Sequence, residues 1–274
     1  MSGRRDVLER IAAALERIAP DDPDEPDWLK SPAYVWDGNT AAPIHHLDAL
    51  PLEILRGIDS QKAAVRQNLV RLAQGSATHD LLLWGARGMG KSALIRSCIA
   101  DIQADTPEPI ALIQIGGDAL AAVPRLLSRL RSVDRAFLLF IDDLGFGADE
   151  KQQMLALRSL LDGGVIPRTE RVRIAVTSNR RAIIARDVNE REALHERDER
   201  DDALALADRF GLTLGFHPCD RATYLEIVRA YTDPLGLTFT EEEATAFAIA
   251  RGNRSGRSAR QFAVELAGAA GLSL

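Results

Sequence analysis

The stretch GARGMGKS combines three glycines with a lysine and a hydroxyl side chain. Gly85, Gly88, Gly90, Lys91 and Ser92 fit the spacing G-x-x-x-x-G-K-[ST] of a loop that cradles phosphates. Glycines let the backbone bend around an anion and aim its N–H groups inward without a side chain in the way. Lys91 would reach the β- and γ-phosphates, and the Ser92 hydroxyl would ligate Mg²⁺. The spacing therefore predicts a nucleoside triphosphate site, with a structural glycine-rich turn as the alternative.

The whole loop is expected to contact the nucleotide. The predicted binding residues are Gly85, Ala86, Arg87, Gly88, Met89, Gly90, Lys91, Ser92 and Ala93. The apolar run LLLW before the loop and the segment ALIRSCIA after it supply the strand and the helix that this motif requires. The helix beginning near Gly90 would direct its positive N-terminal end at the same phosphates.

Polar side chains follow two later apolar runs. Asp142 and Asp143 come directly after AFLLFI, and Asn179 follows the run RIAVTS. Asp142 is expected to hold Mg²⁺ through water, and Asp143 to orient or deprotonate the attacking water. Asn179 would hold that water or sense the γ-phosphate, because ligands bind at the tips of central parallel strands. The alternatives are an N-cap pair for the two aspartates and an Asx turn for Asn179.

Strand and helix patterns alternate after residue 80 and would position these residues. The predicted strands are 81–84, 110–115, 136–141, 172–177 and 212–216, and the predicted helices are 90–104, 119–131, 149–162 and about 203–209. Strands that are apolar throughout and that take turns with helices predict a parallel sheet covered on both faces.

The flanking segments predict four parts in the chain: an amphipathic helix over 1–19, an acidic and proline-rich linker with an irregular segment over 20–49, an α/β core over 50–217, and a helical domain over 218–274. The core includes a helix from Asp59 to about Gln74. Helices at 221–232, 241–251 and 258–270 make up the C-terminal domain, with Asp220 and Thr240 as N-caps. The first helix would pack on the body or bind a partner, and the charged segment 186–202 would be solvated.

Composition favours a soluble, cytoplasmic protein. The chain has 274 residues, 46% of them hydrophobic, and a net charge of −6, which disfavours a broad nucleic-acid surface. Its longest apolar runs are too short to span a bilayer, and its first residues make a poor signal peptide.

Cys98 and Cys219 show no metal or disulfide spacing, and Cys98 is expected in the core. Trp28, Tyr34 and Trp36 would anchor their segment, cover a base or stack on nucleic acid.

The order of these motifs resembles an AAA+ ATPase. The phosphate loop is followed by IDDL, TSN, LADRFGLTL and a helical tail with SGRSARQF, and ADRFGLTL is similar to replication initiators and helicase loaders. From about residue 50 to 270 the chain resembles a bacterial family of AAA+-like ATPase domains whose function is unknown. The resemblance implies a three-layer P-loop fold of the ASCE/AAA+ type with strand order 5-1-4-3-2 and an all-α lid. It also implies ATP with Mg²⁺ as ligands.

The resemblance assigns roles to three arginines. Arg209 matches the arginine finger that a neighbouring protomer presents to the γ-phosphate, with a local ion pair to Asp202 or Asp208 as the alternative. Arg260 matches the sensor 2 arginine of the lid. Arg257 could take that role instead, because arginines recur there every three residues, and the stripe could also be solvated or touch an anionic partner. The resemblance further implies a homo-oligomer with an unidentified protein or nucleic-acid partner and no membrane.

Two features depart from the AAA+ pattern. Most of these hydrolases have Asp-Glu where this chain has Asp142-Asp143, and replication initiators, which turn ATP over slowly, share that departure. The segment after the second predicted strand, IQIGGDALAAVP, has no aromatic pore-loop residue, which disfavours polypeptide threading. Three functions therefore stay open: an ATPase whose site a neighbour completes, a slow nucleotide-gated switch, and, with least support, a P-loop kinase.

Overall fold

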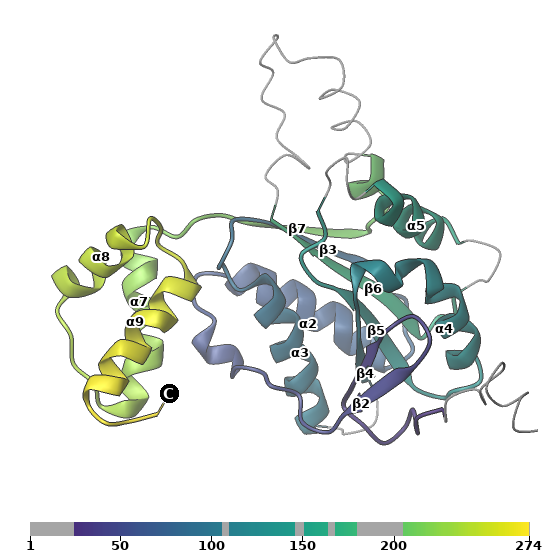
Figure 1. The fold of residues 1–274 in the computed structure, drawn as a ribbon, viewed down its shortest axis with the longest axis horizontal. Helices are drawn as coiled ribbons and strands as arrows, with labels where there is room; N and C mark the ends of the chain where they lie inside the picture. The colour runs from purple at the N-terminus through teal and green to yellow at the C-terminus, as the bar shows by residue number, and fades with distance from the viewer. Residues whose placement is uncertain (1–24, 106–109, 146–150, 164–167, 180–204, 274) are drawn as a thin grey trace, which may run out of the picture.

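The fold is described from a computed structural model for residues 25–105, 110–145, 151–163, 168–179 and 205–273. The helix predicted over 1–19, the start of the linker and the charged segment 186–202 lie outside these residues. Figure 1 shows an α/β body with three helices of the C-terminal region set beside it. Within the described residues, no helix combines the length and the apolar character that a membrane crossing requires.

A seven-stranded sheet forms the centre of the described residues. Its strands are β1 (Ala33–Trp36), β2 (Ala41–Ile44), β3 (Leu81–Gly85), β4 (Ile110–Ile115), β5 (Ala136–Ile141), β6 (Val172–Ser178) and β7 (Leu212–Phe216). Their order across the sheet is β2-β1-β4-β5-β6-β3-β7, and every neighbouring pair except β1 and β2 is parallel. The five strands predicted from the sequence are β3 to β7. Their order β7-β3-β6-β5-β4 is the expected 5-1-4-3-2.

Helices cover both faces of the sheet (Figure 1). The covering helices are α2 (Asp59–Ala73), α3 (Lys91–Asp105), α4 (Val123–Leu130) and α5 (Lys151–Leu161). Neighbouring residues of a strand face opposite sides, so in β5 Phe137 and Leu139 pack with α4 and α5, whereas Leu138 and Phe140 pack with α2 and α3. All residues of β5 are buried, which explains its uninterrupted apolar run. The expected three layers are thus present.

Two strands were not expected from the sequence. The irregular segment expected within 20–49 contains β1, which pairs in parallel with β4, and β2, which pairs antiparallel with β1. Each strand has only four residues, and Pro43 lies inside β2. A proline usually argues against a strand and is tolerated at a sheet edge, where β2 lies. Pairing with β4, rather than a local pattern, creates this part of the sheet.

A buried arginine ties the segment before β1 to the sheet. The guanidinium of Arg135, which is 2% exposed, donates to the carbonyl oxygens of Trp28 and Ser31, both at 2.8 Å. The Trp28 ring packs against Tyr34 at 4.9 Å and against Phe137 at 5.9 Å between ring centroids. These aromatic side chains are buried, as is Trp36, so the anchoring interpretation is confirmed.

The helix predicted over 119–131 is divided in the structure. A 3₁₀ helix, Gly117–Ala122, comes first, and α4 begins only at Val123. Pro124 lies in the first turn of α4. Because proline lacks an N–H, it cannot continue the hydrogen bonding of an α-helix that started earlier, and it begins a new one instead.

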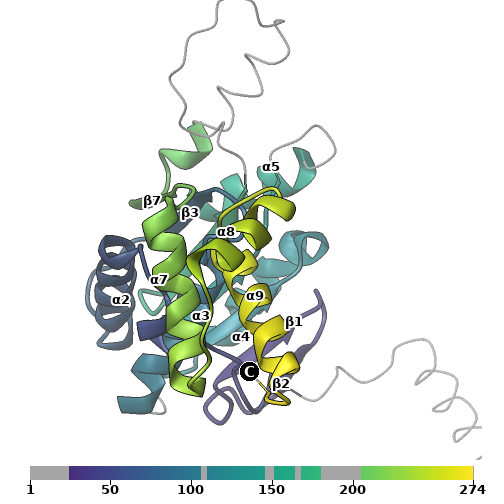
Figure 2. The same cartoon turned by 90° about the vertical axis from the view of Figure 1, so that its left-hand side faces the viewer.

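The C-terminal region forms a helical unit with its own core. It consists of α7 (Arg221–Thr232), α8 (Glu241–Ala250) and α9 (Gly256–Ala269), which Figure 2 shows side by side. Asp220 caps α7, and Thr240 with Glu243 forms the expected capping box of α8. Ser255 and Ser258 cap α9 in the same reciprocal way, a box that was not predicted. We call α7 to α9 the lid.

The Arg135 contacts predict a stability effect. Arg135→Met keeps an apolar stem but leaves the carbonyls of Trp28 and Ser31 without their buried donor. We expect the free energy of unfolding to fall by about 3 kcal/mol, since a hydrogen bond to a charged group contributes roughly 1.5–3 kcal/mol. Urea unfolding measures this, with the exposed Arg131→Met as the matched control. A loss no larger than that of the control would contradict this anchoring role.

Candidate functional site

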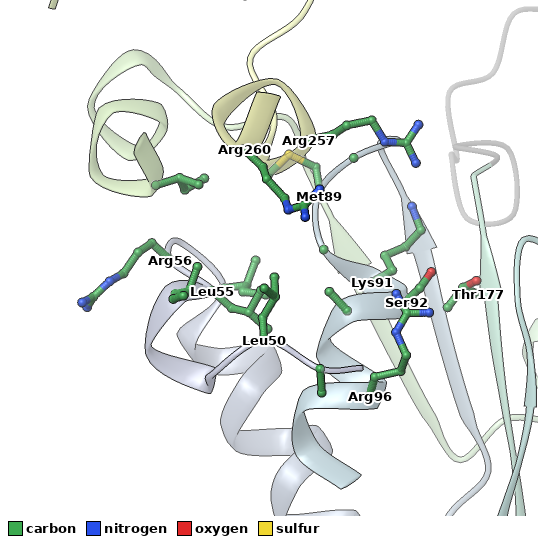
Figure 3. Close-up of a pocket in the computed structure, with 18 of the residues that line it drawn as sticks. Leu50, Leu55, Arg56, Met89, Lys91, Ser92, Arg96, Thr177, Arg257 and Arg260 are labelled. Carbon is green, nitrogen blue, oxygen red and sulfur yellow. The ribbon is translucent and has the colours of Figure 1, made fainter. Parts of the chain in front are cut away.

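A cavity of the described residues lies between the phosphate loop, the segment before α2 and the lid (Figure 3). Its volume is about 630 Å³. The sequence-predicted residues that line it are Gly88, Met89, Gly90, Lys91, Ser92, Ala93, Asp142, Asp143, Asn179, Arg257 and Arg260. The carboxyl ends of β3, β5 and β6 bring the first nine of them together, and α9 brings the two arginines. We call this the main cavity.

Positive backbone angles shape the loop between β3 and α3. Gly85, Gly88 and Gly90 have φ values of 122°, 75° and 86°, a region that L side chains rarely adopt. At Gly85 an added Cβ would also lie 2.1 Å from the carbonyl oxygen of Phe216. That carbonyl accepts a hydrogen bond from the Ala86 N–H at 2.8 Å, so the first turn of the loop is fixed against β7. The glycines of the motif are therefore required by the backbone itself.

The Lys91 ammonium is a buried charge with three acceptors. Its Nζ donates to the carbonyl oxygens of Gly85 at 3.0 Å and Ala86 at 2.9 Å, and to Oδ1 of Asn179 at 2.9 Å. Burial is the main cause that lowers the pKa of Lys91 to about 8, and the charge of Arg257 acts in the same direction. The negative charges of Asp143 and Asp142 oppose that shift. The three acceptors of Lys91 are uncharged oxygens, and an anionic oxygen would be a stronger acceptor.

Ser92, Asp142 and Thr177 form an oxygen-rich corner beside Lys91. The hydroxyls of Ser92 and Thr177 both donate to Oδ1 of Asp142, at 2.5 Å and 2.6 Å. A carboxylate and a hydroxyl are ligands that suit Mg²⁺, which is commonly held by one or two carboxylates together with substrate phosphates. No group of three or more His, Cys, Asp or Glu side chains among the described residues could hold a metal by itself. The donor set therefore fits a cation that arrives with phosphate.

Asp143 and Asn179 are coupled to Lys91 at the tips of neighbouring strands. Asp143 has φ 55°, the only positive φ outside glycine among the described residues, and its N–H donates to Oγ1 of Thr177 at 2.8 Å. Asn179 donates through Nδ2 to Oδ1 of Asp143, while its Oδ1 accepts from Lys91. Such backbone strain is commonly found at functional sites. Asn179 thus links the loop lysine to the exposed acid.

The lid touches the phosphate loop directly. The backbone N–H of Arg257 donates to the carbonyl oxygen of Gly88 at 3.1 Å. An added Cβ at Gly88 would lie 2.9 Å from Oγ of Ser255 and 3.1 Å from Cβ of Arg257. Figure 3 shows the side chain of Arg257 extending toward the region of Lys91, and that of Arg260 directed into the cavity beside Met89. Both predicted lid arginines therefore face the site.

Sequence reasoning missed the other end of the main cavity. It is lined by Asp48, Ala49, Leu50, Ile54, Leu55, Arg56, Ile58, Ile227 and Tyr231, from the segment before α2 and from α7. Most of these side chains are apolar, and the two segments are distant in the sequence, so no local motif marks them. The apolar residues within 47–58 are the one sequence signal that could have indicated an apolar lining for this part of the cavity.

Arg96 on α3 was missed as well. With it the cavity is lined by five cationic side chains, Arg56, Lys91, Arg96, Arg257 and Arg260, and by three acidic ones, Asp48, Asp142 and Asp143. The whole chain carries a net charge of −6, so this excess of positive charge is local. A concave site with more cations than acids is suited to an anionic ligand.

Four predicted residues do not line the main cavity. Gly85 and Ala86 lie behind Lys91 and contact it through their carbonyls, and Arg87 is exposed. Arg209 lies elsewhere, at a second cavity of about 480 Å³ that residues near the amino ends of β3, β6 and β7 help to form. Its Nε donates to Oδ1 of Asp162 at 2.6 Å, so its ion-pair partner among the described residues is Asp162 rather than Asp208, and Asp202 lies outside those residues.

Solved structures show the same kind of fold. The chain is similar to Orc1 of Aeropyrum pernix, solved in complex with DNA, with a TM-score of 0.58, 15% identity, and coverage of 80% of this chain and 65% of that chain. It is similar to a mutant of Thermotoga maritima RuvB, with a TM-score of 0.51, 15% identity and coverage of 81% and 67%. The match to the Thermotoga maritima RuvB Holliday junction branch migration motor has a TM-score of 0.49, 16% identity and coverage of 81% and 66%.

The chain thus spans about two thirds of the length of these structures. At such identities the likeness concerns the fold, which is AAA+-like: a mostly parallel α/β sheet with a C-terminal helical region. No curated protein matches the chain at a significant level. A family model described as "Protein of unknown function (DUF815)" matches residues 29–270. Because that match covers most of the sequence, the chain belongs to the DUF815 family.

Proposed function

We propose that this protein is an ATPase that binds Mg²⁺-ATP in the main cavity and that a neighbouring protomer completes its site. The observation that carries the proposal is the convergence of Lys91, Ser92, Asp142 and Asn179 on one end of a cationic cavity. The AAA+-like fold supports the same conclusion, because it places these residues at the carboxyl ends of parallel strands. ATP in the cavity would be coupled to loading or remodelling of a protein or nucleic acid, and we expect this to occur in the cytoplasm.

Phosphate binding would rearrange the hydrogen bonds of Lys91. In the ligand-free arrangement its ammonium is held by two carbonyls and an amide oxygen. Charged phosphate oxygens are stronger acceptors, and the glycine loop directs backbone N–H groups to the same place. Ser92 and Asp142 would hold Mg²⁺, whose chemistry here is to neutralise charge on the phosphate oxygens. Catalysis would then depend mainly on the placement of charge.

Water would attack the γ-phosphorus from the side of Asp143. The carboxylate of Asp143 is exposed at the tip of β5 and would orient the water and accept its proton. Asn179, which contacts both Asp143 and Lys91, would hold the same water or the γ-phosphate in line. The bond between the β,γ-bridging oxygen and phosphorus then breaks, and ADP and inorganic phosphate leave.

The lid and the segment before α2 would bind the rest of the nucleotide. The apolar wall with Leu50, Ile54 and Tyr231 suits an aromatic base, since ligand sites are mostly apolar with a few polar groups. Arg260 and Arg257 would act on the phosphate chain from the lid. Arg257 is the better candidate for the terminal phosphates, because its charge acts on Lys91.

Arg209 would act on the site of the next protomer. It lies away from the main cavity of its own chain, as an arginine that serves a neighbour must. Its ion pair with Asp162 is part-exposed, so the side chain can exchange that partner for a phosphate at modest cost. This role requires a homo-oligomer. Orc1 of Aeropyrum pernix, a structural relative, was solved with DNA, which makes nucleic acid one partner to test.

A slow nucleotide switch is the second candidate. Asp143 has a shorter side chain than the glutamate usual at this position, and it is tied to Asn179 in a strained backbone conformation. A partner that releases Asp143 from Asn179 would then be needed for fast turnover. No feature of the described residues favours the kinase alternative.

Two substitutions separate binding from chemistry. Lys91→Ala should weaken ATP binding at least about hundredfold, because it removes the buried cation of the loop. Asp143→Asn should leave ATP affinity within about threefold of wild type and lower phosphate release at least about tenfold. Isothermal titration and a phosphate-release assay measure the two effects. Unchanged ATP binding in Lys91→Ala would refute the proposed site.

Arg209→Ala tests the shared site. If a neighbour supplies Arg209, the specific rate of phosphate release of the wild type rises with protein concentration, and the variant loses that rise but still binds ATP. The assay covers a hundredfold range of protein concentration, roughly the span over which assembly changes. Arg221→Ala, on the lid surface, is the matched control. Loss of ATP affinity in Arg209→Ala would instead make Arg209 a structural residue.

The lowered pKa of Lys91 predicts that ATP affinity depends on pH. Phosphate favours the charged ammonium, so above pH 8 binding must take up a proton that free Lys91 has lost. We expect affinity to be nearly constant up to about pH 7.5 and roughly tenfold weaker at pH 9 than at pH 7. Lys91→Arg should remove this dependence, because guanidinium does not titrate in that range. A wild-type affinity equal at pH 7 and pH 9 would show that the pKa of Lys91 is not lowered.

A further inference from the structure

The further inference concerns Arg96, a residue that belongs to none of the motifs that define the phosphate site. It lines the main cavity from α3. Ser92 lies four positions earlier on the same helix, so the two residues share one face. Long side chains on a helix lean toward its N-terminus, and one turn rises about 5.4 Å, within the reach of an arginine. Figure 3 shows Arg96 extending along α3 toward Ser92.

The Arg96 guanidinium has no hydrogen bond or ion pair among the described residues. It differs in this from Arg66 on α2, which pairs with Asp101 of α3 at 2.7 Å. It also differs from Arg56, which lines the cavity at its far end and is directed away from the loop in Figure 3. A guanidinium keeps its charge at any relevant pH. Arg96 is therefore a permanent cation, without a partner among the described residues, at the Ser92 end of the cavity.

The Ser92 end of the cavity is where the outer phosphates would lie. Ser92 and Asp142 are the residues that would hold Mg²⁺ beside the outer phosphates. Lys91, which would reach the same phosphates, is already placed by three acceptors. An arginine beside Ser92 can donate two parallel hydrogen bonds to oxygens of a single phosphate, which a lysine cannot do.

We propose that Arg96 binds the γ-phosphate of the nucleotide from within the same chain and makes the site select a triphosphate over a diphosphate. The proposal rests on the proposed function and adds a specificity residue to it. Arg96 supplies positive charge at the outer phosphates in addition to that of the metal. Selection for the triphosphate therefore persists, in weaker form, when Mg²⁺ is removed.

The test compares the binding of ADP and of a non-hydrolysable ATP analogue to the full-length protein by isothermal titration, with Mg²⁺ and with EDTA. In Arg96→Gln the affinity for the ATP analogue should fall at least about tenfold and that for ADP less than about threefold, since only the triphosphate offers the lost charged hydrogen bonds. The loss should be larger in EDTA. Arg96→Lys should restore part of the selectivity, and Arg66→Gln, which removes an equal charge from the surface, should leave both affinities unchanged.

The outcomes separate this inference from the proposed function. If the wild type binds neither nucleotide, the proposed function fails, whatever Arg96 does. If the wild type binds ATP and Lys91→Ala does not, but Arg96→Gln keeps the wild-type ratio of the two affinities, the Arg96 inference alone is overturned. Equal losses for both nucleotides also overturn it, because Arg96 would then act on a part of the ligand that ADP and ATP share. Thermal unfolding of each variant shows whether the protein is folded.

Discussion

The buried ammonium of Lys91 is the interaction on which the rest of the site depends. Three oxygens from two separate strand ends surround it: those of Gly85 at the end of β3, of Ala86 directly after it, and of Asn179 after β6. This is possible only because β3 and β6 are neighbours in the sheet, with Trp84 opposite Ser178. On the other side of β6 lies β5, which delivers Asp142 and Asp143. The strand order is thus the condition that lets one lysine connect the loop with the acids.

The lid packs directly on the same loop. Gly88 has no side chain, and the space that a Cβ would take is closed by Ser255 and Arg257. The first turn of α9 can therefore rest on the loop, with a backbone hydrogen bond between Arg257 and Gly88. A change in the shape of the loop is transmitted to α9 at once, since two close-packed backbones cannot move independently. If the proposed function holds, an anion bound at the strand tips would therefore also change the orientation of α7 to α9.

Much of this arrangement follows from local sequence signals. The buried strands are continuous apolar runs, and the loop residues are adjacent in the chain, so the strands β3 to β7 and the position of Lys91 in the loop could be predicted. The pair β1 and β2 could not, because four-residue strands with Pro43 acquire their structure only by pairing with β4. Tyr231 was missed because folding alone brings it to the cavity. Arg96 shares a helix face with Ser92, but it lies outside the spacing of the phosphate-loop motif. The pairing of Arg209 with Asp162 joins residues 47 positions apart, which no local pattern encodes.

The position of Trp84 gives the molecule a built-in optical signal. Trp84 ends β3 directly before the loop, and its indole ring lies against Gly215 and edge-on to His217, 5.9 Å away, where the chain leaves β7 for the lid. Trp28 and Trp36 are buried near the opposite edge of the sheet, where β1 lies. A change of intrinsic fluorescence on adding a ligand is therefore expected to come mainly from Trp84, which lies where the sheet, the loop and the lid meet. The unlabelled protein can thus be used to follow how fast its lid responds.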